Sequence, residues 1–190
     1  MRMNKWFCGA FWGAFAVVMA ASPSVASDWR VDPVESKLIF NYSEDGARAV
    51  GGFSKFEAEA NFDPNAPEAA KMRLVIDVDS VEMPDALRTG FVKGEDWFDV
   101  ANHPQARFEL TEMAPAAQLG MFTVEGVLTI KEVSKEISVP TLVVIDGARA
   151  LARGEISFDR RDFNVDGEVP FVALGPEVTV VFSLVAQRAP

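Results

Sequence analysis

The sequence predicts an all-β protein in which eight antiparallel strands close into a barrel beside one short helix. Eight stretches alternate apolar with polar residues, which is the period of a strand with one buried face. Turn-forming residues separate nearly all of these stretches, and a single segment has helical spacing instead. Closing half-buried strands into a barrel removes exposed strand edges. A two-layer sandwich satisfies the same alternation and stays the alternative.

The alternating stretches are spread over the chain beyond residue 36. They are Lys37–Tyr42, Lys55–Phe62, Met72–Asp79, Gln105–Met113, Met121–Ile130, Ile137–Ile145, Ala152–Asp159 and Val178–Leu184. The turns are marked by Asp45-Gly46, Asp63-Pro64-Asn65, Gly120, Asp146-Gly147 and Gly175-Pro176. We expect Gly51-Gly52 to lead into the second strand, and the sixth strand to bend at Pro140.

The one helical segment is expected at about residues 85–94. Pro84-Asp85 begins it, Leu87 and Phe91 share a face, and Gly94 ends it. Trp97 and Phe98 follow directly and are expected near one end of the barrel. They would serve there either as a plug of the core or as a lid over a ligand.

The predicted inner face combines large rings with very small residues. From strand parity, the lining of the interior is predicted to be Phe40, Phe56, Phe108, Phe122, Phe158 and Phe182, with Trp97 and Phe98 near an end. The same faces carry Ala58, Ala60, Ala106, Gly126, Ala152 and Gly154. An eight-stranded barrel can be filled by side chains or can hold one small ligand. The small residues therefore either leave an apolar cavity or make room for the rings.

Catalytic and metal-binding residues are scarce, so no catalytic residue and no metal site is predicted. His103 is the only histidine, lies in a turn before Pro104, and cannot form a histidine-rich metal site by itself. Asp77 and Asp79 are expected on one solvated strand face. Arg160, Arg161 and Lys93 would suit an anionic head group if the fold gathers them at a mouth.

The first 26 residues have the pattern of a cleaved export signal. Arg2 and Lys5 precede the uncharged apolar run 6–21, and Ser24-Val25-Ala26 forms a small-x-small cleavage site. Cys8, the only cysteine, lies inside this segment. Cleavage after Ala26 would leave one domain of residues 27–190 in the periplasm and would take the formal net charge from −10 to −12. Such an acidic chain is not expected to bind nucleic acid.

Five short motifs, in order from Trp29 to Ala186, resemble those of the YceI-like, polyisoprenoid-binding family of exported bacterial proteins. They are Trp29-Arg30-Val31-Asp32-Pro33 with Ser36 and Phe40, Gly52-Phe53-Ser54-Lys55-Phe56, Asp96-Trp97-Phe98-Asp99-Val100 with Pro104 and Phe108, Gly126-Val127-Leu128-Thr129-Ile130, and Ser157-Phe158-Asp159-Arg160-Arg161-Asp162-Phe163. The resemblance implies a lipocalin-like barrel that holds a quinone or polyprenyl lipid, such as ubiquinone, with no other cofactor.

The chain departs from the family pattern at a few positions. Glu35 stands where the family often has histidine, a second histidine is missing, and Glu132 and Glu136 replace a usual glycine and proline. The variant without these histidines resembles the subgroup found with b-type membrane cytochromes, which makes such a cytochrome an expected partner.

Taken together, these residues predict a non-enzymatic, monomeric or weakly dimeric protein that binds an isoprenoid lipid. Two alternatives stay open at this point. One is a packed envelope stress or docking module without a ligand, and the other is an envelope hydrolase that would need two carboxylates converging on a cleft.

Overall fold

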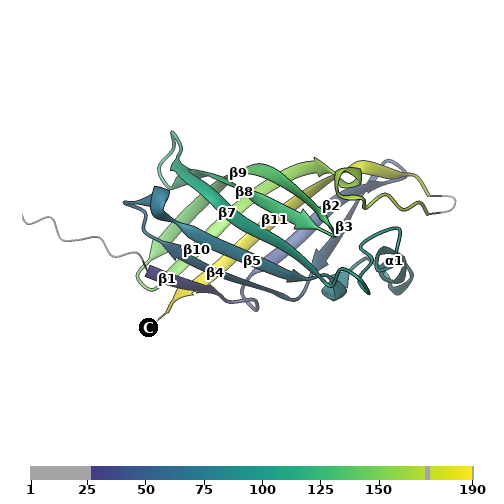
Figure 1. Cartoon of the computed structure of the whole chain (residues 1–190), viewed down its shortest axis with the longest axis horizontal. Coiled ribbons are helices and arrows are strands. Elements are labelled where there is room, and N and C mark those ends of the chain that lie inside the picture. Colours follow the sequence, from purple (N-terminus) through teal and green to yellow (C-terminus); the bar gives the residue numbers. More distant parts are fainter. Residues whose placement is uncertain (1–26, 170–171, 190) are drawn as a thin grey trace, which may run out of the picture.

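The computed structural model describes residues 27–169 and 172–189, so the predicted signal segment lies outside the described residues. Its strands form one antiparallel sheet that curls into an elongated barrel (Figure 1). The strands are β1 (Ser27–Val31), β2 (Lys37–Glu44), β3 (Ala47–Phe53), β4 (Phe56–Phe62), β5 (Lys71–Asp77), β6 (Val81–Glu82), β7 (Gln105–Pro115), β8 (Met121–Ile130), β9 (Val133–Asp146), β10 (Arg149–Asp159) and β11 (Leu174–Arg188).

Eight of these strands close the ring. Their order is β1-β4-β5-β7-β8-β9-β10-β11, and β11 returns to β1 through the pairs Trp29↔Arg188 to Val31↔Ala186. This closure confirms the predicted eight-stranded antiparallel barrel and excludes the sandwich. Strand β11 is long enough to pair with β1 near its end and with β2 along Leu174–Ser183, so β2, β3 and β6 extend the sheet beyond the ring.

Three strands were not predicted from the alternation. β1 has five residues of which only Trp29 is buried, and β6 has two residues, so neither gives a readable period. Gly51 and Gly52 lie inside β3 and do not lead into the next strand, which corrects the expectation for this dipeptide. Two adjacent glycines remove the side chains on which an alternating pattern depends.

Strand β9 runs unbroken through Pro140, but its pairing changes there. Its ladder with β10 stops at the pair Thr141↔Gly154, whereas its ladder with β8 continues to Val133. A proline has no N–H to donate, so it suits the point where a strand loses its neighbour. The short 3-10 helix η3 (Arg160–Phe163) contacts both strands where they separate.

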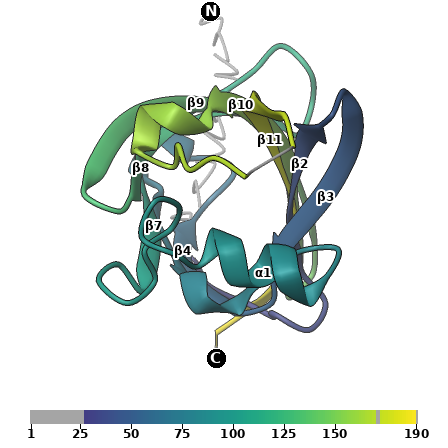
Figure 2. The same ribbon diagram turned by 90° about the vertical axis from the view of Figure 1, so that its right-hand side faces the viewer.

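The helix α1 (Ala86–Val92) lies across the same end of the barrel (Figure 2). The Asp85 side chain caps it by accepting a hydrogen bond from the Arg88 N–H at 2.8 Å. Leu87 and Phe91 are 70% and 42% exposed, whereas Val92 is buried. Two further 3-10 turns, η1 (Pro67–Ala69) and η2 (Val78–Ser80), connect strands. Within the described ranges, no helix is long and apolar enough to cross a membrane.

Candidate ligand-binding cavity

The barrel encloses a cavity of about 630 Å³ that runs from β1 to α1. This volume is typical of sites that take small organic molecules, roughly 300–1,000 Å³. The lining is almost wholly apolar, and its charged members are Glu44, Lys71, Arg88 and Arg160. An interior of this kind can hold a hydrocarbon chain by removing it from water.

Glycines beside aromatic rings keep the rings against the barrel wall. A methyl carbon built on Gly126 would lie 2.4 Å from Cζ of Phe108, and one on Gly154 would lie 2.6 Å from Cζ of Phe182. Gly51 stands in the same relation to Phe40 at 2.4 Å. Each ring therefore fills the space left by a missing side chain on the neighbouring strand.

The small inward residues were predicted either to leave a cavity or to make room for the rings, and the structure shows one use for the glycines and the other for the alanines. The glycines receive rings, as the packed-core interpretation expects. The alanines at positions 60, 106 and 152 line the cavity, as the pocket interpretation expects. The cavity persists because the rings are held at its wall.

Of the eight predicted lining residues, six lie on the cavity surface. They are Phe40, Phe108, Phe158, Phe182, Trp97 and Phe98. Phe56 and Phe122 are buried in the core and are not among the residues that line the cavity. The Phe122 ring packs edge-on against the Phe62 ring, 5.6 Å between centroids, and Phe62 lines the cavity there. That any of these side chains contacts a ligand stays a prediction.

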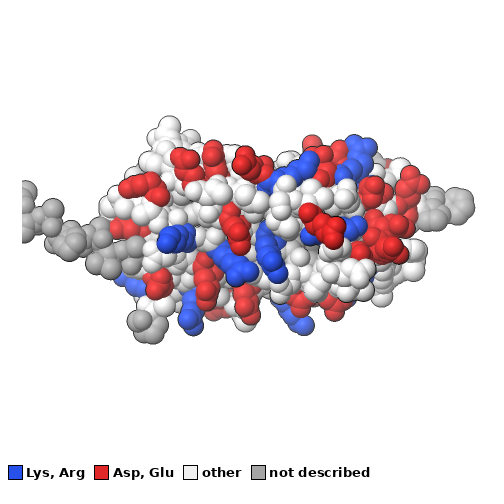
Figure 3. All heavy atoms as spheres, in the orientation of Figure 1, with Lys and Arg blue, Asp and Glu red and all other residues white. Residues whose placement is uncertain are grey.

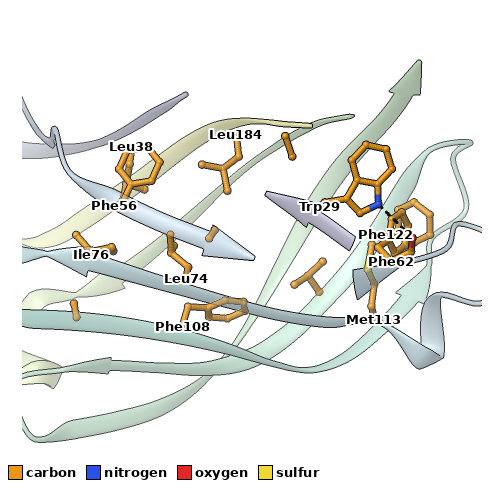
Figure 4. Close-up of a cluster of buried hydrophobic side chains, with 14 of the residues drawn as sticks. Trp29, Leu38, Phe56, Phe62, Leu74, Ile76, Phe108, Met113, Phe122 and Leu184 are labelled. Atoms are coloured by element: carbon orange, nitrogen blue, oxygen red, sulfur yellow. Dashed lines mark hydrogen bonds between the residues drawn. The ribbon is translucent and has the colours of Figure 1, made fainter. Parts of the chain in front are cut away.

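Trp29 lines the cavity at the β1 end, and Figure 4 shows its ring beside Phe62, Phe122 and Met113. Its indole N–H donates to the Phe62 carbonyl at 3.4 Å, and its ring lies with Phe62, Phe122 and Met113 in one buried cluster. The Arg188 guanidinium lies over the Trp29 ring, with its central carbon 5.0 Å from the ring centroid. The alternation of apolar and polar residues did not predict the position of Trp29, because β1 is too short to show a period.

At the α1 end, away from Trp29, the cavity is lined by Trp97 and Arg160. The Arg160 guanidinium lies 5.0 Å from the Trp97 ring and donates to the carbonyls of Val165 at 2.6 Å and Gly175 at 3.3 Å. Burial lowers the pKa of Arg160. Trp97 belongs to a second buried cluster with Val92 and packs against Gly167 so closely that a methyl group there would meet the indole at 2.3 Å.

The other two cations predicted at a mouth lie at the α1 end but outside the cavity. Arg161 pairs with Asp159, 2.5 Å between Nη2 and Oδ2, and Lys93 pairs with Asp79 at 2.8 Å. Neither lines the cavity. The structure thus brings Arg160 alone of the three to the interior.

Arg88 fastens α1 to β2. Its Nε donates to both carboxylate oxygens of Glu44 at 3.1 Å, and its other nitrogens pair with Glu44 and Asp85. These two carboxylates raise the pKa of Arg88, which keeps it charged. Beside this pair, the Tyr42 ring lines the cavity.

The scarce polar groups predicted from the sequence form no reactive cluster in the part of the chain that the structure describes. No group of three or more histidine, cysteine or acidic side chains is placed to hold a metal within these residues. His103 lies in a turn, 3.7 Å from Asp99, and does not line the cavity. Asp77 ends β5 and caps η2 by accepting from the Asp79 N–H at 3.1 Å, so these two aspartates do not share a strand face.

The fold and the cavity define the class of small closed β-barrels with an apolar interior. Comparison with known families identifies the family within this class. The YceI-like domain model matches residues 29–186, so the chain belongs to the YceI-like family. This confirms the resemblance drawn from the five sequence motifs.

Individual relatives agree with this assignment. The chain is 29% identical over 196 residues to a UPF0312 protein of Yersinia pestis, covering 96% of both chains. It is similar to the crystal structure of BcnA of Burkholderia cenocepacia, with 34% identity, a TM-score of 0.77, and coverage of 83% of this chain and 99% of that one. A polyisoprenoid binding domain from Saccharophagus degradans has the same fold, with a TM-score of 0.70 at 17% identity over 87% and 99% of the two chains.

Proposed function

We propose that this protein is an exported binding protein that holds an isoprenoid lipid, such as a quinone or a polyprenyl chain, inside its barrel without changing it chemically. One observation carries the proposal. A closed eight-stranded barrel surrounds a 630 Å³ cavity in which charged side chains are rare. The Saccharophagus domain, described as polyisoprenoid binding, supports the choice of ligand.

The physical basis for affinity is the transfer of the chain out of water. Burying a methylene group is worth about 0.8 kcal/mol, so a five-carbon isoprene unit gains on the order of 4 kcal/mol before ordering costs. A branched, semi-rigid chain also suits a wall of fixed rings. A barrel that only packs its own core, as in the docking-module alternative, has no use for such a cavity.

Export, stoichiometry and any b-type cytochrome partner belong to the proposal as predictions from the sequence. Ser27, the first residue after the predicted cleavage site, pairs with Phe62 in the barrel, so cleavage after Ala26 would leave the described fold intact. The mass of protein recovered from the periplasm tests this directly. A mature chain that begins at Ser27 is expected, and retention of the first 26 residues would refute export by cleavage.

Lipid binding is tested by native mass spectrometry of protein purified from periplasm without detergent. A mass increment equal to an isoprenoid lipid is expected, and its fragmentation identifies that lipid. A barrel that emerges empty and also ignores added ubiquinone would refute the proposal.

A matched pair of variants tests the place of binding. Ala152 lines the cavity, and Arg153, the next residue of β10, is exposed. Ala152→Leu should reduce lipid occupancy by filling the cavity, whereas Arg153→Leu should leave occupancy unchanged. Equal occupancy in both variants would place the ligand outside the barrel.

A further inference from the structure

A second hollow, of about 500 Å³, lies against the barrel wall at the Trp29 end, the end at which β1 lies. Its border combines outward side chains of β1, β4, β5 and β7 with four inward side chains of the same strands, those of Trp29, Ala60, Met72 and Leu110. These four also line the central cavity, and so does Lys71, whose side chain is exposed. Only a single layer of side chains therefore separates the central cavity from the outer hollow.

Strand pairing is interrupted at this place. The ladder between β5 and β7 ends at Arg73↔Glu109, although β5 begins at Lys71 and β7 continues to Pro115. Over the same stretch β5 stays paired with β4, β7 stays paired with β8, and β1 keeps both of its neighbours. The interruption is thus confined to the seam between β5 and β7.

This seam has a frame on three sides. β7 carries a bulge between Leu110 and Glu112, directly after its last pair with β5. Bulges end strand pairing and are common beside functional sites. Beyond the bulge, the 3-10 helix η1 contacts β7, so the gap is bounded by β5, β7 and η1. It is a window in the side of the barrel.

Burial of the inward side chains decreases toward the seam. Ala58, Leu74 and Phe108 form one inward row across β4, β5 and β7 and are 4%, 8% and 7% exposed. The next row toward Trp29, at positions 60, 72 and 110, is only half-buried. One member of this row, Met72, has an unbranched and flexible side chain that adapts easily to its surroundings. The partition between cavity and hollow is therefore thin and adaptable.

The rim of the hollow is polar and electrically balanced. Its charged members are three cations and three carboxylates, namely Arg30, Lys71, Arg73, Asp28, Glu59 and Glu109. Arg30 and Glu59 are 3.9 Å apart, Arg73 and Glu109 are 3.7 Å apart, and all four side chains are more than half exposed, so these ion pairs are weak. Figure 3 shows basic and acidic side chains interspersed over the face that β4, β5 and β7 form. The aliphatic stems of arginine and lysine can lie along an apolar chain while their charged heads stay in water.

We infer that the seam between β5 and β7 is a side opening through which the end of an isoprenoid chain longer than the cavity leaves the barrel. Displacement of Met72 joins the two spaces, and the stems of Arg30, Lys71 and Arg73 then cover the emerging chain. The inference rests on the proposed function and adds to it a tolerance of long chains. A barrel closed along this seam would accept only chains that fit inside it.

Two ubiquinones with the same head group, ubiquinone-2 and ubiquinone-8, separate a short chain from a long one. A matched pair of variants separates the hollow from the rest of the surface. Glu59 and Glu57 are both exposed on the outer face of β4, two residues apart. Glu59 borders the outer hollow, whereas Glu57 borders neither the hollow nor the cavity.

Glu59→Trp places a large ring in the path of the emerging chain. Relative to wild type it should weaken ubiquinone-8 binding by about tenfold, since part of the chain then loses its apolar contacts, and leave ubiquinone-2 binding unchanged. Glu57→Trp should leave the binding of both unchanged. Native mass spectrometry titrations measure all four affinities. Equal effects of the two substitutions, or equal losses for the two ubiquinones, would overturn the side opening.

Amide hydrogen exchange of the wild-type protein locates the chain directly. Ubiquinone-8 should slow exchange at residues 71–72 and 110–112 by covering them, whereas ubiquinone-2 should leave these amides as they are in the empty barrel. The same exchange with both ubiquinones would contradict an emerging chain. If neither ubiquinone binds wild type, the proposed function itself fails, an outcome distinct from one in which both bind and only the effect of chain length is missing.

Discussion

The two ends of the barrel are closed by different means. At the Trp29 end, β1 bridges β4 and β11 by backbone hydrogen bonds, and an indole ring sits on a cluster of buried rings. At the α1 end, β9 and β10 separate beyond Pro140, and a seven-residue helix, η3 and ion pairs cover the opening. The first end depends on buried apolar area and continuous strand pairing. The second combines a buried cluster around Trp97 and Val92 with a short helix that is joined to β2 by exposed or partly buried ion pairs.

This difference indicates which end a ligand uses. Ion pairs at partly exposed side chains contribute little stability, about 0–1 kcal/mol, so those that join α1 to β2 hold this helix less firmly than strand pairing holds the other end. Leu87 and Phe91 keep part of their apolar surface in contact with solvent at that cover while they also line the cavity. We therefore expect entry at the α1 end and stability from the Trp29 end.

The largest difference in the free energy of unfolding should appear when one large side chain at each end of the barrel is replaced by alanine. Trp29 is 4% exposed and Phe91 is 42% exposed. Trp29→Ala should lower the free energy of unfolding by about 3–5 kcal/mol, because it removes a buried ring and leaves a cavity. Phe91→Ala should lower it by less than about 1 kcal/mol. Urea denaturation measures both, and equal losses would abolish the distinction between the ends.

A smaller effect is expected from adding a methyl group at two glycines. Gly126→Ala should destabilise the barrel by about 1–3 kcal/mol, because the new methyl would meet the Phe108 ring at 2.4 Å and the Glu109 carbonyl at 2.5 Å. Gly90→Ala, in the exposed helix α1 with nothing within 4 Å, should stabilise it by up to about 1 kcal/mol. Thermal melts of both variants test this, and a neutral Gly126→Ala would show that the Phe108 ring moves freely.

The smallest effect is the loss of stability at the α1 end as the pH falls. Hydrogen bonds from Arg161 lower the pKa of Asp159 to about 2, and contacts with Lys93 and Arg88 lower the pKa values of Asp79 and Asp85. All three carboxylates lie at the α1 end. A carboxylate whose folded pKa lies below its unfolded value of about 3.9 stabilises above that value and loses this contribution as pH falls.

Amide hydrogen exchange is the appropriate measurement. Between about pH 4 and pH 2, the amides of α1 and η3 should lose protection before those of β1 and β4. Asp159→Asn should weaken this dependence at η3. Simultaneous loss of protection at both ends would show that acid acts on the whole barrel and not on its α1 end.

Strand parity predicted the ring well where strands are long. β10 shows this, because its half-buried residues alternate with exposed ones from Ala152 to Phe158. β1 and β3 escaped prediction because one is too short and the other contains Gly51-Gly52. Parity assigns a side chain to a face, but the neighbouring strands decide whether it reaches the void, as Phe122 behind Phe62 shows.

The polar end of the cavity could not have been predicted from the sequence. Arg88 and Glu44 are 44 positions apart in the sequence and meet only because the fold brings α1 beside the end of β2. The replacement of a family glycine by Glu132 also has a local explanation. The turn between β8 and β9 takes its left-handed residue at Lys131, φ 54°, where Lys131 also donates to the Asn164 carbonyl at 2.9 Å.

The pairing of rings with glycines means that the width of the cavity depends on glycines behind the lining rings. Gly51, Gly126 and Gly154 present no side chain to the interior, yet each decides how far an aromatic ring can retreat from the axis. Substitutions at these glycines could therefore change the width of the cavity while every lining residue stays the same. Relatives with identical linings could accept lipids of different thickness for this reason alone.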